Sequence, residues 1–158
     1  MINRKILLFI LFFISLGSYA SEQAKIETLL KQSNLYDYSG VAQNEWVLVQ
    51  FWNPFCLPCG EEVKVLNKYL TQSETRSKKI KIVGVPFGAR EQEILKFIEH
   101  FKPNYTQWRP DTKLSSFLQK KRTVPWTLLL DQKRQLITQW YGSTELNELS
   151  KKINRYIK

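Results

Sequence analysis

The feature that most constrains the fold is a pair of cysteines placed between a strand and a helix. Cys56 and Cys59 are the only two cysteines among the 158 residues of the chain. Residues 46–52 are nearly all β-formers, which predicts a strand buried on both faces. Pro54 and Pro58 interrupt this run, and apolar residues at helical spacing follow Cys59. The cysteine pair is therefore expected at the N-terminus of a helix that directly follows a central strand.

Three kinds of site use such a pair, and two of them fit the chain poorly. A structural disulfide that encloses only two residues restrains the unfolded chain very little. A zinc site needs four ligands, and the chain offers two thiols and a single histidine, His100. We therefore expect neither a metal nor a cofactor, and the favoured interpretation is a dithiol that opens and closes during function.

The position of each cysteine predicts its role in thiol exchange. Unpaired N–H groups and the helix dipole at the N-terminus favour a thiolate at Cys56, with a pKa below the usual value of about 8.5. Cys59 follows one turn later on the same face and can resolve a mixed disulfide. Glu62 shares that face, where its carboxylate can accept the Cys59 proton. The alternative for Glu62 is a solvated first-turn glutamate favoured by the helix dipole.

The first twenty residues have the pattern of a secretory signal peptide. Arg4 and Lys5 are positively charged, residues 6–16 are almost all apolar, and the small residues Ser18 and Ala20 suit a cleavage site. The apolar run is shorter than the roughly 20 residues that span a bilayer. We expect a periplasmic protein whose residues 1–20 are cleaved, with a retained inner-membrane anchor facing the periplasm as the alternative. In such a compartment a disulfide persists.

The chain is basic, with a formal net charge of +10. Its lysines and arginines form small scattered clusters, which is typical of a solvated surface. Export and the absence of any nucleic-acid-binding motif argue against a nucleic-acid partner. The charge leaves a modest preference for acidic partners or anionic lipid.

The order of the remaining elements predicts an α/β fold. Residues 21–44 read as an N-terminal helix and a connecting segment, and residues 45–158 as one domain. Further strands are expected at residues 79–85, 123–130 and 135–141, and helices at residues 91–101, after Asp111, and at residues 144–157. Residues 105–108 are ambiguous. Because a short turn joins the last two strands, they should pair as an antiparallel hairpin, giving a central mixed β-sheet flanked by helices in three layers.

Pro125 lies inside a run of β-formers, where it costs a ladder hydrogen bond. A cis Val124–Pro125 bond at the start of the strand would explain it, and a trans proline on an edge strand is the alternative. The cis form would place the Val124 backbone beside the dithiol, where it can pair with an extended substrate segment. Trp52 and Trp126 are expected to flank the dithiol, where they pack or contact substrate.

With these residues in place, the chain from Glu45 to Lys158 resembles the thioredoxin superfamily. The resemblance is greatest to its exported reductase branch, of the TlpA, ResA and DsbE type. It rests on the strand at residues 47–52, on Cys56-Leu57-Pro58-Cys59 with Glu62, and on residues 124–131. It implies Cys56 as nucleophile, Cys59 as resolving thiol, Glu62 as the proton-handling carboxylate and Pro125 as a cis proline.

Two departures from the family pattern concern the site. Gln50 stands where thioredoxin has a buried aspartate, and Trp126 stands where a threonine commonly follows the proline. These departures leave the substrate open rather than the chemistry.

The predicted function is that of a monomeric periplasmic thiol:disulfide oxidoreductase. Leu57 and Pro58 between the cysteines resemble reducing members of the superfamily, which favours reduction of protein disulfides. Apocytochrome c or secreted proteins would be the substrates, and a membrane thiol would supply electrons. An oxidase or isomerase, or an exported thioredoxin-like binding module of a secretion or conjugation system, stays open as an alternative.

Overall fold

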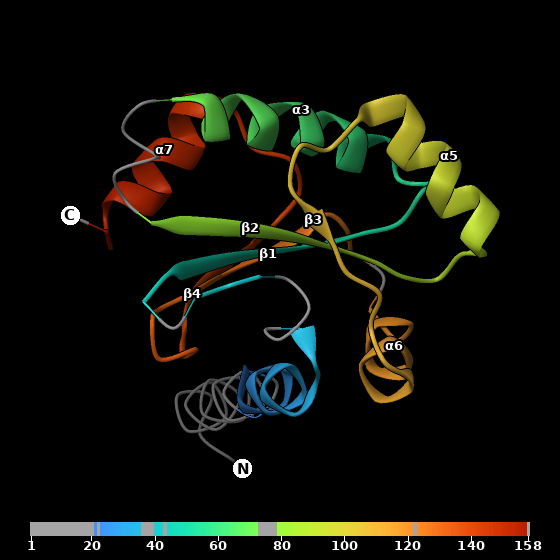
Figure 1. Cartoon of the computed structure of the whole chain (residues 1–158), viewed down its shortest axis with the longest axis horizontal. Helices are drawn as coiled ribbons and strands as arrows, with labels where there is room; N and C mark the ends of the chain where they lie inside the picture. Colours follow the sequence, from blue (N-terminus) through green and yellow to red (C-terminus); the bar gives the residue numbers. More distant parts are fainter. Residues whose placement is uncertain are drawn as a thin grey trace, which may run out of the picture.

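A computed structural model describes residues 21, 23–35, 40–42, 44–72, 79–121 and 123–157. The predicted signal peptide at residues 1–20 lies outside them. A five-stranded sheet forms the middle layer, with helices on both faces (Figure 1). The elements in chain order are β1 Trp46–Trp52, α3 Leu57–Thr71, β2 Ile80–Pro86, α5 Glu91–Phe101, β3 Thr106–Gln107, α6 Thr112–Leu118, β4 Trp126–Leu130, β5 Leu136–Tyr141 and α7 Leu146–Asn154. The predicted three-layer α/β fold is confirmed.

The strands follow the order β3-β2-β1-β4-β5, so β1 lies at the centre of the sheet. β2 runs parallel to β1, β4 runs antiparallel to it, and β5 pairs antiparallel with β4 as the predicted hairpin. The hairpin turn is held by Asp131, whose Oδ1 accepts hydrogen bonds from the Lys133 and Gln135 backbone N–H groups at 2.8 Å. Arg134 in this turn has a positive φ of 63°. The sheet is thus mixed, with its antiparallel pairs on one side.

Alternate residues of β1 face two different cores. Val47, Val49 and Phe51 belong to a core with the helix at residues 23–32 and with α6. Leu48 and Trp52 point to the opposite face, which α3, α5 and α7 cover (Figure 1). Because strand side chains alternate with a period of two, Gln50 shares the α3 face with Leu48 and Trp52. β1 therefore presents one buried polar residue beneath the helix that follows the cysteines.

The helix at residues 23–32 is part of the same hydrophobic core as the sheet. Ile26 and Leu30 are buried among residues of β1, β4 and α6. Glu27 also links this helix to the sheet, because its Oε1 accepts a 2.7 Å hydrogen bond from the Leu136 backbone N–H of β5. This helix covers the sheet face opposite α3, so it supports β1 from below.

Two strands differ from the sequence-based expectation. The ambiguous residues 105–108 contain β3, whose Thr106 and Gln107 pair with Val83 and Gly84 of β2. The strand expected from residue 123 begins at Trp126 instead. Proline lacks a backbone N–H, so the regular ladder of β4 starts only after Pro125.

Close packing of α3 against α5 depends on Gly60, the residue after Cys59. A Cβ built at Gly60 would overlap the Phe101 side chain at the end of α5. We expect Gly60→Ala to lower the free energy of unfolding by about 1–3 kcal/mol, because overpacking a tight contact outweighs the better helix propensity of alanine. Urea unfolding at constant m-value measures this loss. Adding Phe101→Leu should recover part of it, whereas a stabilised Gly60→Ala protein would contradict the packing argument.

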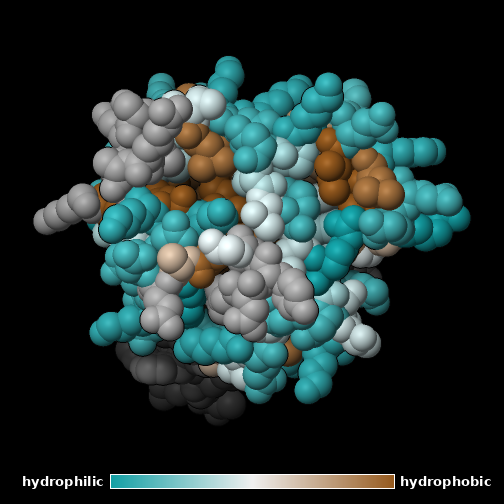
Figure 2. Space-filling view, viewed as in Figure 1, coloured by the Kyte–Doolittle hydropathy of each residue, from teal (hydrophilic) through white to brown (hydrophobic). Residues whose placement is uncertain are grey.

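The face of the molecule seen in Figure 2 is mostly hydrophilic. Apolar side chains gather there in two separate areas, one of them on the side of α5, which carries the exposed Leu95. Among the helices of the described residues, none combines the length and apolar character needed to cross a bilayer.

Candidate functional site

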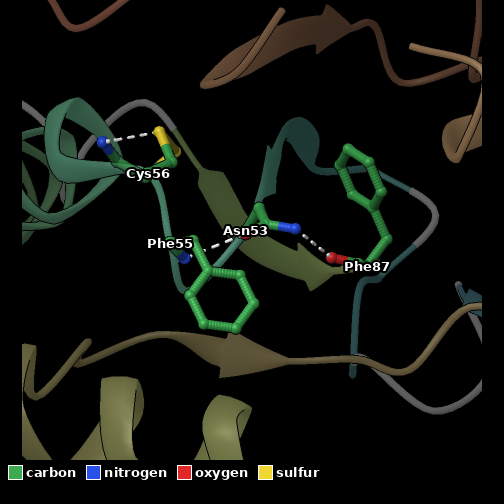
Figure 3. The surroundings of a disulfide bond; sticks show 5 residues. Asn53, Phe55, Cys56 and Phe87 are labelled. Atoms are coloured by element: carbon green, nitrogen blue, oxygen red, sulfur yellow. Dashed lines mark hydrogen bonds between the residues drawn. A yellow bond between two sulfur atoms is a disulfide. The ribbon is translucent and has the colours of Figure 1, made fainter. Parts of the chain in front are cut away.

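The dithiol lies in the loop between the central strand and α3. Cys56 is the N-cap residue of α3, with extended backbone angles, and Pro58 occupies the first turn. The two cysteines form a disulfide, with their Cα atoms 5.3 Å apart. The Cys59 backbone N–H points at the Cys56 Sγ, at an N–S distance of 3.2 Å (Figure 3). The Cys56 sulfur therefore occupies the positive end of the helix, as the sequence predicts.

The loop that carries Cys56 is fixed by the side chain of Asn53. The Asn53 Oδ1 accepts a 2.9 Å hydrogen bond from the Phe55 N–H, and its Nδ2 donates to the Phe87 carbonyl at 3.0 Å (Figure 3). The Asn53 carbonyl also accepts the Cys56 N–H at 3.1 Å. One side chain thus ties the loop after β1 to the loop after β2, which holds the first cysteine in place.

The two cysteines differ sharply in access. Cys59 is completely buried, within a cluster formed with Trp52, Val63, Ile94 and Phe97. Cys56 is only partly buried at the edge of this cluster. On either side of Cys56, the side chains of Phe55 and Leu57 are 72% and 76% exposed. An incoming disulfide can reach only the first sulfur, and it meets apolar side chains there.

Glu62 belongs to α3, and its side chain is completely buried. Its Oε2 accepts a 2.8 Å hydrogen bond from the Thr144 backbone N–H. Burial raises the pKa of Glu62 from 4.5 to about 7, although the Thr144 N–H, the nearby Trp140 indole and the Lys152 charge each lower it. The Trp140 Nε1 and the Glu62 Oε1 do not, however, form a hydrogen bond of good geometry. The solvated alternative for Glu62 is therefore wrong, and the carboxyl can exchange a proton near neutral pH.

The Val124–Pro125 peptide bond is cis. Val124 packs against the cluster that contains Cys59, so the segment before β4 lies beside the dithiol. The Pro125 carbonyl accepts a 2.9 Å hydrogen bond from the Gly142 N–H, which anchors this segment to the end of β5.

The structure separates the two tryptophans that were expected to flank the dithiol. Trp52 packs in the Cys59 cluster and stacks on Phe97, with ring centroids 4.2 Å apart. Trp126 instead points to the opposite face of the sheet, against Phe51. Each side chain is 1% exposed, so both serve packing and neither offers surface to a partner in this state.

Comparison with known proteins identifies the family of the chain. The family model of AhpC/TSA matches residues 20–154. The chain belongs to the AhpC/TSA family. No curated relative is similar enough in sequence to be matched.

Solved structures similar to this AhpC/TSA member share its thioredoxin-like fold. The thioredoxin domain of a thiol-disulfide oxidoreductase from Bacteroides vulgatus is 22% identical, with a TM-score of 0.60 over 73% of this chain and 81% of that one. A DsbE-type thiol:disulfide interchange protein from Chlorobium tepidum is 20% identical, with a TM-score of 0.60 over 72% and 80%. A secreted disulfide oxidoreductase from Mycobacterium tuberculosis is 15% identical, with a TM-score of 0.58 over 73% and 84%.

In this AhpC/TSA member, sequence reasoning missed four polar residues on the face of the sheet that α3 and α7 cover. Thr127, Trp140 and Lys152 come from β4, β5 and α7, Tyr105 directly precedes β3, and no local pattern connects them. The Tyr105 hydroxyl donates a 2.7 Å hydrogen bond to the Gln50 Oε1. Lys152 donates to the Thr144 hydroxyl at 3.2 Å. The signal that could have found them is Gln50, a polar residue inside an apolar central strand.

Proposed function

We propose that the chain is an exported thiol:disulfide oxidoreductase that reduces protein disulfides. The observation that carries this proposal is the contrast between the two sulfurs. One is partly exposed at the positive end of a helix, and the other is buried one helical turn before Glu62, a carboxyl of raised pKa. The disulfide oxidoreductases of similar fold support the proposal.

The first step is attack by the Cys56 thiolate on a partner disulfide. The Cys59 N–H and the helix dipole favour the thiolate because both place positive charge at the sulfur. A Cys56–partner disulfide forms, the partner's own S–S bond breaks, and its leaving sulfur takes up a proton. The exposed side chains of Phe55 and Leu57 give the partner an apolar surface, and the Val124–Pro125 segment can pair with its extended backbone.

The second step is attack by Cys59 on the sulfur of Cys56. The buried Cys59 thiol must first lose its proton, and the ionised Glu62 carboxylate is the group on the same helix face that accepts it. The Cys56–Cys59 disulfide forms, and the second partner thiol leaves. Two electrons have then passed to the partner. A thiol donor, which we propose to be membrane-bound, restores the dithiol.

Residues 1–20 support export, because they combine positive charge, an apolar run and small residues before Ser21. We therefore propose a periplasmic location. N-terminal sequencing of the protein from the envelope fraction tests this, since a mature chain that starts at Ser21 is expected. An intact Met1 in the membrane fraction would favour the anchored alternative.

The activity is tested by trapping partners with Cys59→Ser in the native envelope. This variant keeps the attacking thiol and lacks the resolving one, so mixed disulfides should accumulate and be released by reductant. Cys56→Ser is the matched control and should capture nothing. Equal capture by both variants would point to a non-specific thiol, and no capture by either would favour a binding module.

The direction of the reaction is tested by the reduction potential of the cysteine pair, measured against glutathione. A reductase should have a value well below about −180 mV, whereas a value near about −120 mV is typical of strong oxidants. The second result would overturn the proposal of a reductase and favour an oxidase.

A further inference from the structure

A row of polar side chains crosses the sheet beneath α3. Gln50 of β1 pairs in register with Thr127 of β4, and Thr127 pairs with Trp140 of β5. Register partners on neighbouring strands place their side chains about 5 Å apart on one face. These three residues therefore form a continuous line on the face that also receives Glu62. The exchange chemistry described above uses none of them.

Each member of this row has a buried polar atom without a hydrogen-bond partner in the described part of the chain. These atoms are the Gln50 Nε2, the Thr127 Oγ1 and the Trp140 Nε1, and all three can donate. The Glu62 Oε1 is buried and equally unpaired. An ionised carboxylate can only accept hydrogen bonds. Three unsatisfied donors and one unsatisfied acceptor thus lie on one buried face of the sheet. Native proteins leave few such atoms without a hydrogen bond.

Tyr105 orients the first of these donors. Its hydroxyl donates to the Gln50 Oε1, so the Nε2 is the end of the amide that stays available. Tyr105 is itself buried. Its pKa is raised well above the usual value, mainly by burial and to a lesser extent by the charge of Glu62. The hydroxyl therefore keeps its proton throughout the working pH range. It also lies close enough to Glu62 to respond to the charge of the carboxylate.

We propose that Gln50, Thr127 and Trp140 are positioning residues that stabilise the ionised form of Glu62, and that Tyr105 fixes the Gln50 amide for this task. This role follows because burial and hydrogen-bond donors have opposite effects on the ionisation of Glu62. Burial alone favours the protonated acid, which cannot accept the Cys59 proton. Donors buried on the same face as the carboxylate can restore part of the ionised form at neutral pH, and the Trp140 indole already lowers the pKa of Glu62. The row thereby sets the pH above which the second step of exchange proceeds.

Other groups also face Glu62, and their effects on its pKa are separate from those of Gln50, Thr127 and Trp140. Lys152 of α7 supplies positive charge, and the Thr144 N–H before α7 supplies a hydrogen bond. Both lower the pKa of Glu62. A variant in the row leaves these two groups in place, so any further change in the titration belongs to the row itself. The inference rests on the proposed function only in naming Cys59 as the proton donor.

The test is Thr127→Val, which removes the hydroxyl and keeps the shape of the side chain. The carboxyl of Glu62 is followed by carbon NMR of the full-length protein during a pH titration. We expect the pKa of Glu62 to rise from about 7 by roughly one unit, because the variant removes a buried donor from the sheet face that holds the carboxyl. Tyr105→Phe should move it in the same direction by a smaller amount, and Thr138→Val on β5, outside the row, should leave it unchanged.

The activity gives a second readout that a purely structural role would not move. In Thr127→Val the low-pH limb of the exchange rate should shift to higher pH together with the Glu62 titration. A pKa of Glu62 that stays fixed or falls in both Thr127→Val and Tyr105→Phe would overturn the inference. If the pKa rises but Cys59→Ser captures no partner, the row is established and the proposed function is the part that fails.

Discussion

Cys56→Ser is expected to lower the rate of protein disulfide reduction by roughly 10³-fold or more, because it removes the attacking sulfur. Cys59 is completely buried and cannot replace it. A serine hydroxyl at the helix N-terminus stays protonated near neutral pH, so the favourable position of residue 56 yields no nucleophile. The measurement is the steady-state rate of reduction of a disulfide-bonded test protein with dithiothreitol as electron source, corrected for the reductant alone.

Cys59→Ser is the matched control for that experiment, because it also removes one sulfur and prevents the internal disulfide. It should lose turnover but keep the first step, seen as one equivalent of partner thiol released quickly per protein molecule. In the reduced wild-type protein, iodoacetamide should modify Cys56 well before Cys59. If Cys56→Ser kept its turnover while Cys59→Ser lost the initial release, the assigned roles of the two sulfurs would be reversed.

The sequence alone predicts the strands and helices whose residues follow a clear strand or helix pattern. The continuous β-formers of β1 and the helical spacing after Cys59 predict the strand and α3 that hold the dithiol. The two-residue strand β3 has no such pattern. Gln107 of β3 packs where Gly84 of β2 has no side chain, and the Gln107 Oε1 accepts the Trp52 indole N–H at 3.0 Å. Pairing of this kind is visible only in three dimensions.

The residues of the candidate site also fall into those that the sequence predicts and those that it does not. Helical spacing was enough to place Glu62 on the face of Cys59, since residues three apart are neighbours on a helix. Trp126 was misplaced because proximity in sequence to Pro125 says nothing about the face on which a strand residue points. Tyr105 and Thr127 have no sequence pattern of their own, because their importance depends on the neighbours that the sheet brings to them, and Gln50 is the one signal that points toward them.

The stability of the oxidised protein should fall as pH rises from about 4.5 to 7, and Glu62→Gln should abolish this component. The native pKa of Glu62 is about 7, and its usual value is 4.5. Between these values the native protein retains a proton that the unfolded chain has released. The free energy of unfolding therefore decreases by about 1.4 kcal/mol per pH unit, or about 3 kcal/mol in all. Above pH 7 both states are ionised, and the decrease stops.

Urea unfolding of the wild type and of Glu62→Gln, from pH 4.5 to pH 8, measures this effect as a difference. Other titrating groups are the same in both proteins and cancel. Glutamine keeps an oxygen that can accept the Thr144 N–H, so the charge is the main change. Glu61→Gln is the control, because Glu61 is exposed and pairs with the exposed Lys64. The free energy of unfolding of the wild type, relative to that of Glu62→Gln, should fall as pH rises from 4.5 to 7. A difference independent of pH would mean that the buried carboxyl titrates as it does in water, and it could not then act as the proton acceptor for Cys59 near neutral pH.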